Sequence, residues 1–223
     1  MKNQDVSVYE ILRDKIINLD FKPGQEININ SIAEELGVSR SPIRDALLRL
    51  EIDNLVEIFP QKGTRVSFLN KDIIEQERFM RTTMELAVLK NFMENLNDES
   101  KREICATKLY SIILQQHANL LAGDKKLFLQ NDDKLHHFFY TESDSQWIWN
   151  VVTSHTGNDH RIRILSYNAQ QIADEVENEH RELVKAVQDG DAERAVAIDR
   201  NHLTKLLEVL GTLEKNYPEY FKK

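Results

Sequence analysis

Two short helices separated by a glycine are predicted between residues 30 and 50, and this arrangement constrains the fold more than any other feature of the chain. Ser31 and Glu34 have the spacing of a capping box, in which each side chain satisfies an amide of the first helical turn. Gly37 can take the left-handed conformation that ends the first helix. A further helix is predicted upstream over residues 9–19, where apolar residues recur at helical spacing.

The second helix of the pair carries two arginines on one outer face. Arg40 and Arg44 are four residues apart, which places them about 40° apart around the helix axis. Ser39 or Ser41 is placed to cap this helix, and its apolar residues face inward. A solvated helix face is the alternative interpretation, but the helix pair has the geometry of a helix-turn-helix that enters the DNA major groove. Arg49 lies about 140° from Arg44, so we expect a surface or phosphate role for it.

Two strands with a tight turn are predicted directly after the helix pair. Residues 55–59 and 64–68 alternate as strands do, and they are separated by Pro60-Gln61-Lys62-Gly63. This is the pattern of a wing. Lys62 and Arg65 are then placed to contact DNA phosphates.

The charge of the chain bears on this interpretation. The net charge is -8, and residues 1–70 hold nine Lys and Arg against eleven Asp and Glu, a net of -2. A DNA-binding module without bulk positive charge must concentrate its cations on one face. We therefore expect a homodimer on a palindromic operator, since two subunits double the phosphate contacts.

Residues 6–68 resemble the winged helix-turn-helix of the GntR family of bacterial transcription regulators. The resemblance depends on Pro23-Gly24, on the run from Leu36 to Arg44, and on Gly63. Asn30 departs from the family at a contact position, and Asn54 replaces a usual glycine but tolerates left-handed geometry. The resemblance implies that double-stranded operator DNA is contacted by Ser39, Arg40, Ser41, Arg44, Gln61, Lys62 and Gly63.

The remainder of the chain is predicted to be a second, helical domain. We place the boundary so that residues 1–70 form the DNA-binding domain and residues 71–223 form the second domain. The fold class is therefore mainly α, with a winged helix-turn-helix of three helices and a two-stranded wing followed by an antiparallel bundle of six or seven helices. Gly157 is expected to bend or split the fourth helix of the bundle. The predicted helices cover residues 71–95, 100–122, 124–141, 144–168, 170–189 and 191–213.

No signal peptide or membrane-length apolar run is found in the sequence, and Cys105 is the only cysteine. These features predict a cytoplasmic protein without disulfides and without a membrane partner.

The histidines of the second domain are placed to converge. Asp133 and His137 are four residues apart and share a helix face, while His180 and His202 fall within apolar stripes. His136 lies close to the same face, so spacing does not choose between it and His137. One carboxylate and three imidazoles suit a divalent cation such as Zn, Ni or Mn. The alternative is a set of core histidines that are hydrogen-bonded to carbonyl or carboxylate groups.

Residues 71–213 resemble the FCD effector-binding domain, on the evidence of Arg81-x-x-x-Glu85, Asp133-x-x-His136-His137, Glu179-His180 and His202-Leu203. The resemblance implies a metal held by Asp133, His137, His180 and His202. It also implies that Arg81 pairs with a carboxylate of the effector, although an intrahelical pair with Glu85 is the alternative.

Two further arginines are candidates for the effector cavity. Arg161 and Arg163 lie about 160° apart around a helix axis, so we expect only one of them to face the cavity. Their number indicates a small organic acid as effector.

A metal-dependent hydrolase and a metal-sensing module are the alternative functions. Glu179-His180 matches the end of an inverted zinc-protease motif, but Val176 stands where its first histidine belongs. We therefore predict a regulator and not an enzyme. The effector is expected to change the relative placement of the DNA-binding domains of the two subunits. We expect this change to weaken operator binding and so to relieve repression.

Overall fold

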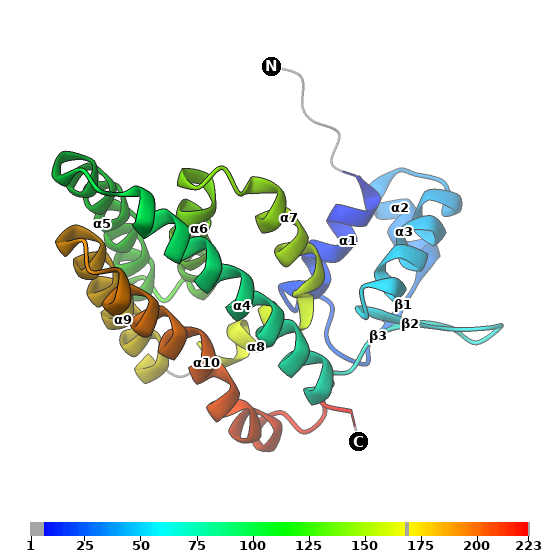
Figure 1. Ribbon diagram of the computed structural model, residues 1–223. Coiled ribbons are helices and arrows are strands. Elements are labelled where there is room, and N and C mark those ends of the chain that lie inside the picture. The colour runs from blue at the N-terminus through cyan, green and yellow to red at the C-terminus, as the bar shows by residue number, and fades with distance from the viewer. Residues whose placement is uncertain (1–6, 168–169, 223) are drawn as a thin grey trace.

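The computed structural model describes residues 7–167 and 170–222, and it consists of a small N-terminal winged helix-turn-helix against a larger helical bundle (Figure 1). The chain is mainly helical, as predicted. The elements of the N-terminal part are α1 (Val8–Ile17), β1 (Glu26–Ile27), α2 (Ile29–Leu36), α3 (Arg40–Ile52), β2 (Val56–Phe59) and β3 (Gly63–Val66). The elements of the bundle are α4 (Lys71–Asn95), α5 (Glu99–Leu121), α6 (Lys125–Glu142), α7 (Gln146–His155), α8 (Gly157–Ser166), α9 (Gln170–Asp189) and α10 (Ala192–Asn216).

The start of α2 differs from the prediction. Asn28 is its N-cap and accepts hydrogen bonds from the backbone amides of Asn30 and Ser31 at 3.0 and 3.2 Å. The helix thus begins before Ser31, so the predicted capping box at that residue is wrong. Gly37 ends the helix with φ 64°, as predicted. Ser39 is the N-cap of α3, but its side chain makes no capping hydrogen bond.

The wing belongs to a sheet of three strands, not two, within the described residues. The strand order is β1-β3-β2, and both pairs are antiparallel. Sequence reasoning missed β1 because two residues carry no alternation that can be recognised. Asn54, just before β2, has φ 57° and so takes the left-handed geometry expected of it.

The predicted helix over residues 144–168 is two helices, α7 and α8, which meet at Thr156 and Gly157. The other helix predictions in the bundle agree with the structure to within a few residues at each end. Gly157 lies against the DNA-binding domain, where a Cβ at this position would come within 2.9 Å of the Leu55 side chain. The break therefore turns α8 so that its first residues contact the N-terminal domain.

The two parts of the chain are joined by packing and by hydrogen bonds. The guanidinium of Arg13 on α1 donates to the carbonyl of Thr153 on α7. Arg161 on α8 donates to the carbonyl of Ser67, just after β3, at 2.9 Å. The C-terminal segment returns to the linker, where the Lys222 amide donates to the Leu69 carbonyl at 2.9 Å. In Figure 1 the C-terminus accordingly lies beside the start of α4.

None of the helices in the described ranges has the length and apolar character needed to cross a membrane.

Candidate metal centre and nucleic-acid interface

Four buried or nearly buried side chains converge inside the bundle. They are Asp132 and His136 on α6, His180 on α9 and His202 on α10, and one ligand atom of each lies within 4.8 Å of all the others. His136 Nε2 lies 3.7 Å from Asp132 Oδ2, and His180 Nε2 lies 3.6 Å from Asp132 Oδ1. One carboxylate and three imidazoles form a donor set suited to a borderline divalent cation.

A second layer of side chains fixes the three histidine rings. The Nδ1 atom of His136 contacts Glu85, that of His180 lies 2.9 Å from Gln116 Oε1, and that of His202 lies 2.9 Å from Glu179 Oε2. In the tautomer that these oxygens favour, Nδ1–H donates outward. Metal-binding histidines are usually oriented in this way.

The inward nitrogens provide an independent test of whether a metal fits. His136 Nε2 and His180 Nε2 are both buried without a hydrogen-bond partner. An unpaired buried polar atom costs free energy, and a cation at this position would satisfy both nitrogens. The residues present therefore fit a divalent metal.

The electrostatics of His180 and Asp132 point the same way, whereas at His136 the contact with Glu85 outweighs burial and raises the pKa of the ring. Burial and the proximity of His202 hold the pKa of His180 well below its usual value, so this ring is neutral at pH 7. Burial opposes ionisation of Asp132, but Arg163 and the histidines outweigh it and hold the pKa of the carboxyl well below its usual value. A neutral imidazole and an ionised carboxylate are the protonation states that metal binding requires.

The predicted residues Asp133 and His137 lie outside this cluster, so the prediction is corrected by one residue to Asp132 and His136. Asp133 accepts from Arg163 at 2.7 Å. His137 stacks on Trp149 and contacts Gln146. The converging pair has the same spacing of four as the predicted pair, but the adjacent Asp-Asp and His-His pairs leave the register open. The apolar stripe of α6 would have indicated it, since Phe128, Leu135 and Phe139 are buried on the face of Asp132 and His136.

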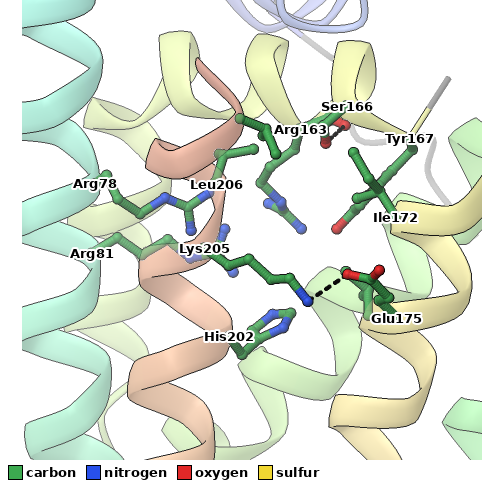
Figure 2. A pocket seen from close by; sticks show the side chains of 12 residues that line it. Arg78, Arg81, Arg163, Ser166, Tyr167, Ile172, Glu175, His202, Lys205 and Leu206 are labelled. Carbon is green, nitrogen blue, oxygen red and sulfur yellow. Dashed lines mark hydrogen bonds and ion pairs between the residues drawn. The ribbon is translucent and has the colours of Figure 1, made fainter. Parts of the chain in front are cut away.

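A pocket of about 60 Å³ adjoins the cluster and is lined by His202, Arg78, Arg81, Arg163 and Lys205. Figure 2 shows the guanidinium groups of Arg78 and Arg163 pointing toward the middle of the pocket, above the ring of His202. We call this cavity the effector pocket. One water molecule needs about 10–15 Å³ of such space, so the pocket accommodates a molecule of only a few heavy atoms.

The arginines of the effector pocket are paired with carboxylates. Arg81 lies 3.4 Å from Glu85 and 3.5 Å from Asp159, so the intrahelical pair considered above is present. Arg78 lies 2.7 Å from Asp159. Arg163 binds both Asp132 and Asp133.

Arg161 is not part of the pocket, and only Arg163 of the predicted pair faces it. Arg161 is fully buried and binds Asn158 and the Ser67 carbonyl. Helix α8 therefore contacts Asp132 of the candidate metal site through Arg163 and the DNA-binding domain through Arg161 and Gly157.

The predicted DNA-contact residues gather at one end of the N-terminal domain. Arg40 and Arg44 line an open groove of about 430 Å³ together with Asn30 of α2 and Gly63 and Thr64 of the wing. Neither arginine has an ion pair within the described residues. The other predicted contacts, Ser39, Ser41, Gln61 and Lys62, are also exposed.

Two other arginines of this domain are engaged elsewhere. Arg65 lies 2.6 Å from Glu57 and over the ring of Phe59, so its predicted phosphate contact is not supported by the geometry. Arg49 lies over the ring of Tyr9, 4.0 Å from its centroid, which agrees with a surface role.

The fold and the sites define a helix-turn-helix DNA-binding protein with a helical ligand-binding domain. Residues 4–66 match the model of bacterial regulatory proteins of the gntR family, and residues 78–205 match the FCD domain. The chain therefore belongs to the GntR family of transcriptional regulators, in its FCD branch.

Relatives of known name agree with this assignment. An uncharacterized HTH-type transcriptional regulator in an unstable DNA locus of Streptomyces ambofaciens is 27% identical over 214 residues, 96% of this chain and 88% of that protein. The HTH-type transcriptional repressor RspR of Escherichia coli K12 is 24% identical over 220 residues, 96% of this chain and 92% of RspR. The structure of E. coli McbR/YncC superposes with a TM-score of 0.75 at 20% identity, covering 97% of this chain and 100% of McbR. The relatives are regulators, so the hydrolase alternative is dropped.

Proposed function

We propose that this regulator is a repressor that binds a palindromic operator as a homodimer. The recognition helix α3 would present Ser39, Arg40, Ser41 and Arg44 to base edges and phosphates, and the wing tip at Gln61, Lys62 and Gly63 would contact the backbone. The support is the groove shared by α3 and the wing and the absence of intramolecular ion pairs at Arg40 and Arg44 in the described chain. RspR, a relative, is named a repressor.

Dimerisation follows from the charge of the DNA-binding part. With a net charge of -2 over residues 1–70, one head offers few cations to phosphates. Two heads on adjacent half-sites double these contacts, and the protein two-fold then matches a palindrome.

The effector is proposed to be a small organic acid that binds in the effector pocket beside a divalent metal, Zn, Ni or Mn. The observation that supports this best is the juxtaposition of two unpaired histidine nitrogens with a pocket lined by Arg78, Arg81 and Arg163. Asp132, His136, His180 and His202 would hold the metal. When bound, the metal supplies a Lewis-acid position for an effector oxygen, while a guanidinium provides a bidentate partner for the carboxylate.

Coupling to DNA is proposed to pass through α8. An effector carboxylate that binds Arg163 competes with Asp132 and Asp133 for the same guanidinium. Any shift of α8 is transmitted to the N-terminal domain through the bond from Arg161 to Ser67 and through the packing of Gly157. The effector can change operator affinity only as far as it binds one arrangement of the two domains more tightly than the other. Such a change is typically a factor of about 5 to 150.

The DNA-binding part of this proposal is tested with duplexes selected by the protein from a randomised pool, with affinity measured by fluorescence anisotropy. Arg40→Ala is expected to cost about 1–3 kcal/mol on the selected duplex and much less on random DNA. Arg49→Ala is the matched control, because Arg49 is held over Tyr9. Equal losses for the two variants, or no loss for Arg40→Ala, would contradict the assignment of α3 as the reading helix.

A further inference from the structure

A second cavity, of about 230 Å³, lies at the junction between the DNA-binding domain and the bundle. We call it the junction cavity. Helix α1 contributes Arg13 to its lining, α7 contributes Trp149 and α8 contributes His160, while Asn18 and Thr156 directly follow α1 and α7. Arg81 and Arg163 line both this cavity and the effector pocket, so these two side chains separate the two spaces.

Arg13 is the lining residue of the junction cavity whose polar atoms are least satisfied by the protein itself. One of its Nη atoms donates to the Thr153 carbonyl, but its Nε is buried without a hydrogen-bond partner. Arg81 and Arg163 are each paired with carboxylates, whereas Arg13 has no such pair within residues 7–167 and 170–222. Two carboxylates also line the cavity: Asp14 is exposed and accepts from Asn18, and Asp133 is paired with Arg163. A half-buried guanidinium without a carboxylate attracts an anion.

His160 supplies a second unpaired polar atom. Its Nε2 is buried without a partner, and its Nδ1 lies 3.9 Å from Asp133 Oδ2. Burial lowers the pKa of His160 to about 4, so the ring is neutral at pH 7 and can exchange hydrogen bonds with a hydroxyl group. Trp149 adds a flat apolar surface.

The charge and size of the cavity narrow the class of ligand. One unpaired guanidinium favours a monoanion. At about 10–15 Å³ for each water-sized position, 230 Å³ holds about 15–23 positions, which suits a six-carbon hydroxy acid. The effector pocket, at about 60 Å³, is too small for such a molecule.

We propose that the junction cavity is a second ligand site that takes a hydroxylated monocarboxylate about the size of a six-carbon sugar acid. Its carboxylate binds Arg13, and a hydroxyl group binds His160. Because the cavity is lined by α1 on one side and by α7 and α8 on the other, the bound anion fixes the DNA-binding domain against the bundle.

The test uses the full chain and sodium gluconate as the probe. The chain has two tryptophans, Trp147 and Trp149, and Trp147 is 75% exposed. In a Trp147→Phe background the fluorescence therefore reports on Trp149 at the cavity wall. Gluconate is expected to change this fluorescence saturably, whereas sorbitol, which lacks the carboxylate, is not.

Variants at Arg13 assign the site. Arg13→Gln should weaken gluconate binding about tenfold or more, while Arg13→Lys retains most of it because the charge remains. Arg49→Gln is the control for loss of one positive charge on the same domain. Where circular dichroism shows that Arg13→Gln does not fold, His160→Leu replaces it, with the same expected direction.

Three results would overturn the proposal. The first is the absence of any saturable response to gluconate, and the second is an affinity that Arg13→Gln, or His160→Leu where it replaces that variant, leaves unchanged. The third is a response lost in Lys205→Gln but kept in Arg13→Gln, which would place the anion in the effector pocket.

Discussion

The stability of this protein should fall in mild acid because of His160, and His160→Asn should remove that part of the dependence. Burial lowers the pKa of this histidine from 6.5 to about 4 in the folded state. A group whose folded pKa is depressed contributes stability above its unfolded pKa and loses it as the pH falls toward the folded value. The window therefore runs from about pH 6.5 down to about pH 4.

The size of the effect follows from the two pKa values. The difference between 6.5 and about 4, at about 1.4 kcal/mol for each pH unit, limits the contribution of His160 to about 3 kcal/mol. At pH 5 only part of this is lost, and linkage gives about 2 kcal/mol relative to pH 8.

Urea unfolding at a series of pH values from 8 to 5 measures this contribution. The difference in unfolding free energy between the wild type and His160→Asn is the quantity to compare, because all other titrating groups are shared. We expect the wild type to lose about 2 kcal/mol of unfolding free energy relative to His160→Asn when the pH is lowered from 8 to 5. A difference that is constant over this range would show that His160 titrates normally and is not desolvated.

The other predictions concern the metal cluster and the domain junction. His136→Gln should abolish stoichiometric metal binding measured by elemental analysis, whereas His137→Gln should retain it; the reverse result would restore the register predicted from sequence. Gln116→Leu removes the partner that orients His180 and should weaken metal affinity about 10–100-fold in a chelator competition, and an unchanged affinity would show that this contact is dispensable. Gly157→Ala introduces a methyl group 2.9 Å from Leu55 and should lower the melting temperature by an amount corresponding to about 1–3 kcal/mol, while Gly211→Ala, with open space around it, should not; equal melting temperatures for the two would contradict tight packing at the junction.

Much of the fold could be predicted because it depends on local chemistry. Gly37 has to take a positive φ to end α2, and Asn54 does so before the wing. The long helices of the bundle are visible from their apolar period. Strand β1, by contrast, forms because Glu26 and Ile27 pair with β3, almost 40 residues away, and this pairing leaves no local pattern.

The residue set predicted from sequence and the set that converges in the structure have the same residue types but differ in register on α6. A period of 3.6 residues places the pairs Asp132–His136 and Asp133–His137 on faces that differ by about 100°. The spacing of four is the same in both pairs, and the first pair shares its face with the buried Phe128, Leu135 and Phe139. The residues that orient the histidines come from other helices, as Gln116 does on α5. Such partners are brought together by tertiary structure, so the spacing of residues along one helix does not predict them.

Arg161 illustrates the same limit for the coupling between the domains. From sequence it is one of two arginines on α8 that compete for a cavity, but the structure places it against the Ser67 carbonyl. Its contact depends on how the N-terminal domain sits on the bundle. The path from Arg163 to Arg161 along α8 therefore emerges only when both domains are seen together.

The most direct test is the operator affinity of the metal-loaded protein with and without a small carboxylate that is first shown by calorimetry to bind the bundle. We predict that saturation with this acid weakens operator binding by a factor of about 5 to 150, and that Arg161→Met, which cuts the contact to Ser67, reduces this factor while leaving acid binding in place. An acid that binds the metal-loaded bundle but leaves operator affinity unchanged would contradict control of the DNA-binding domain from the effector pocket.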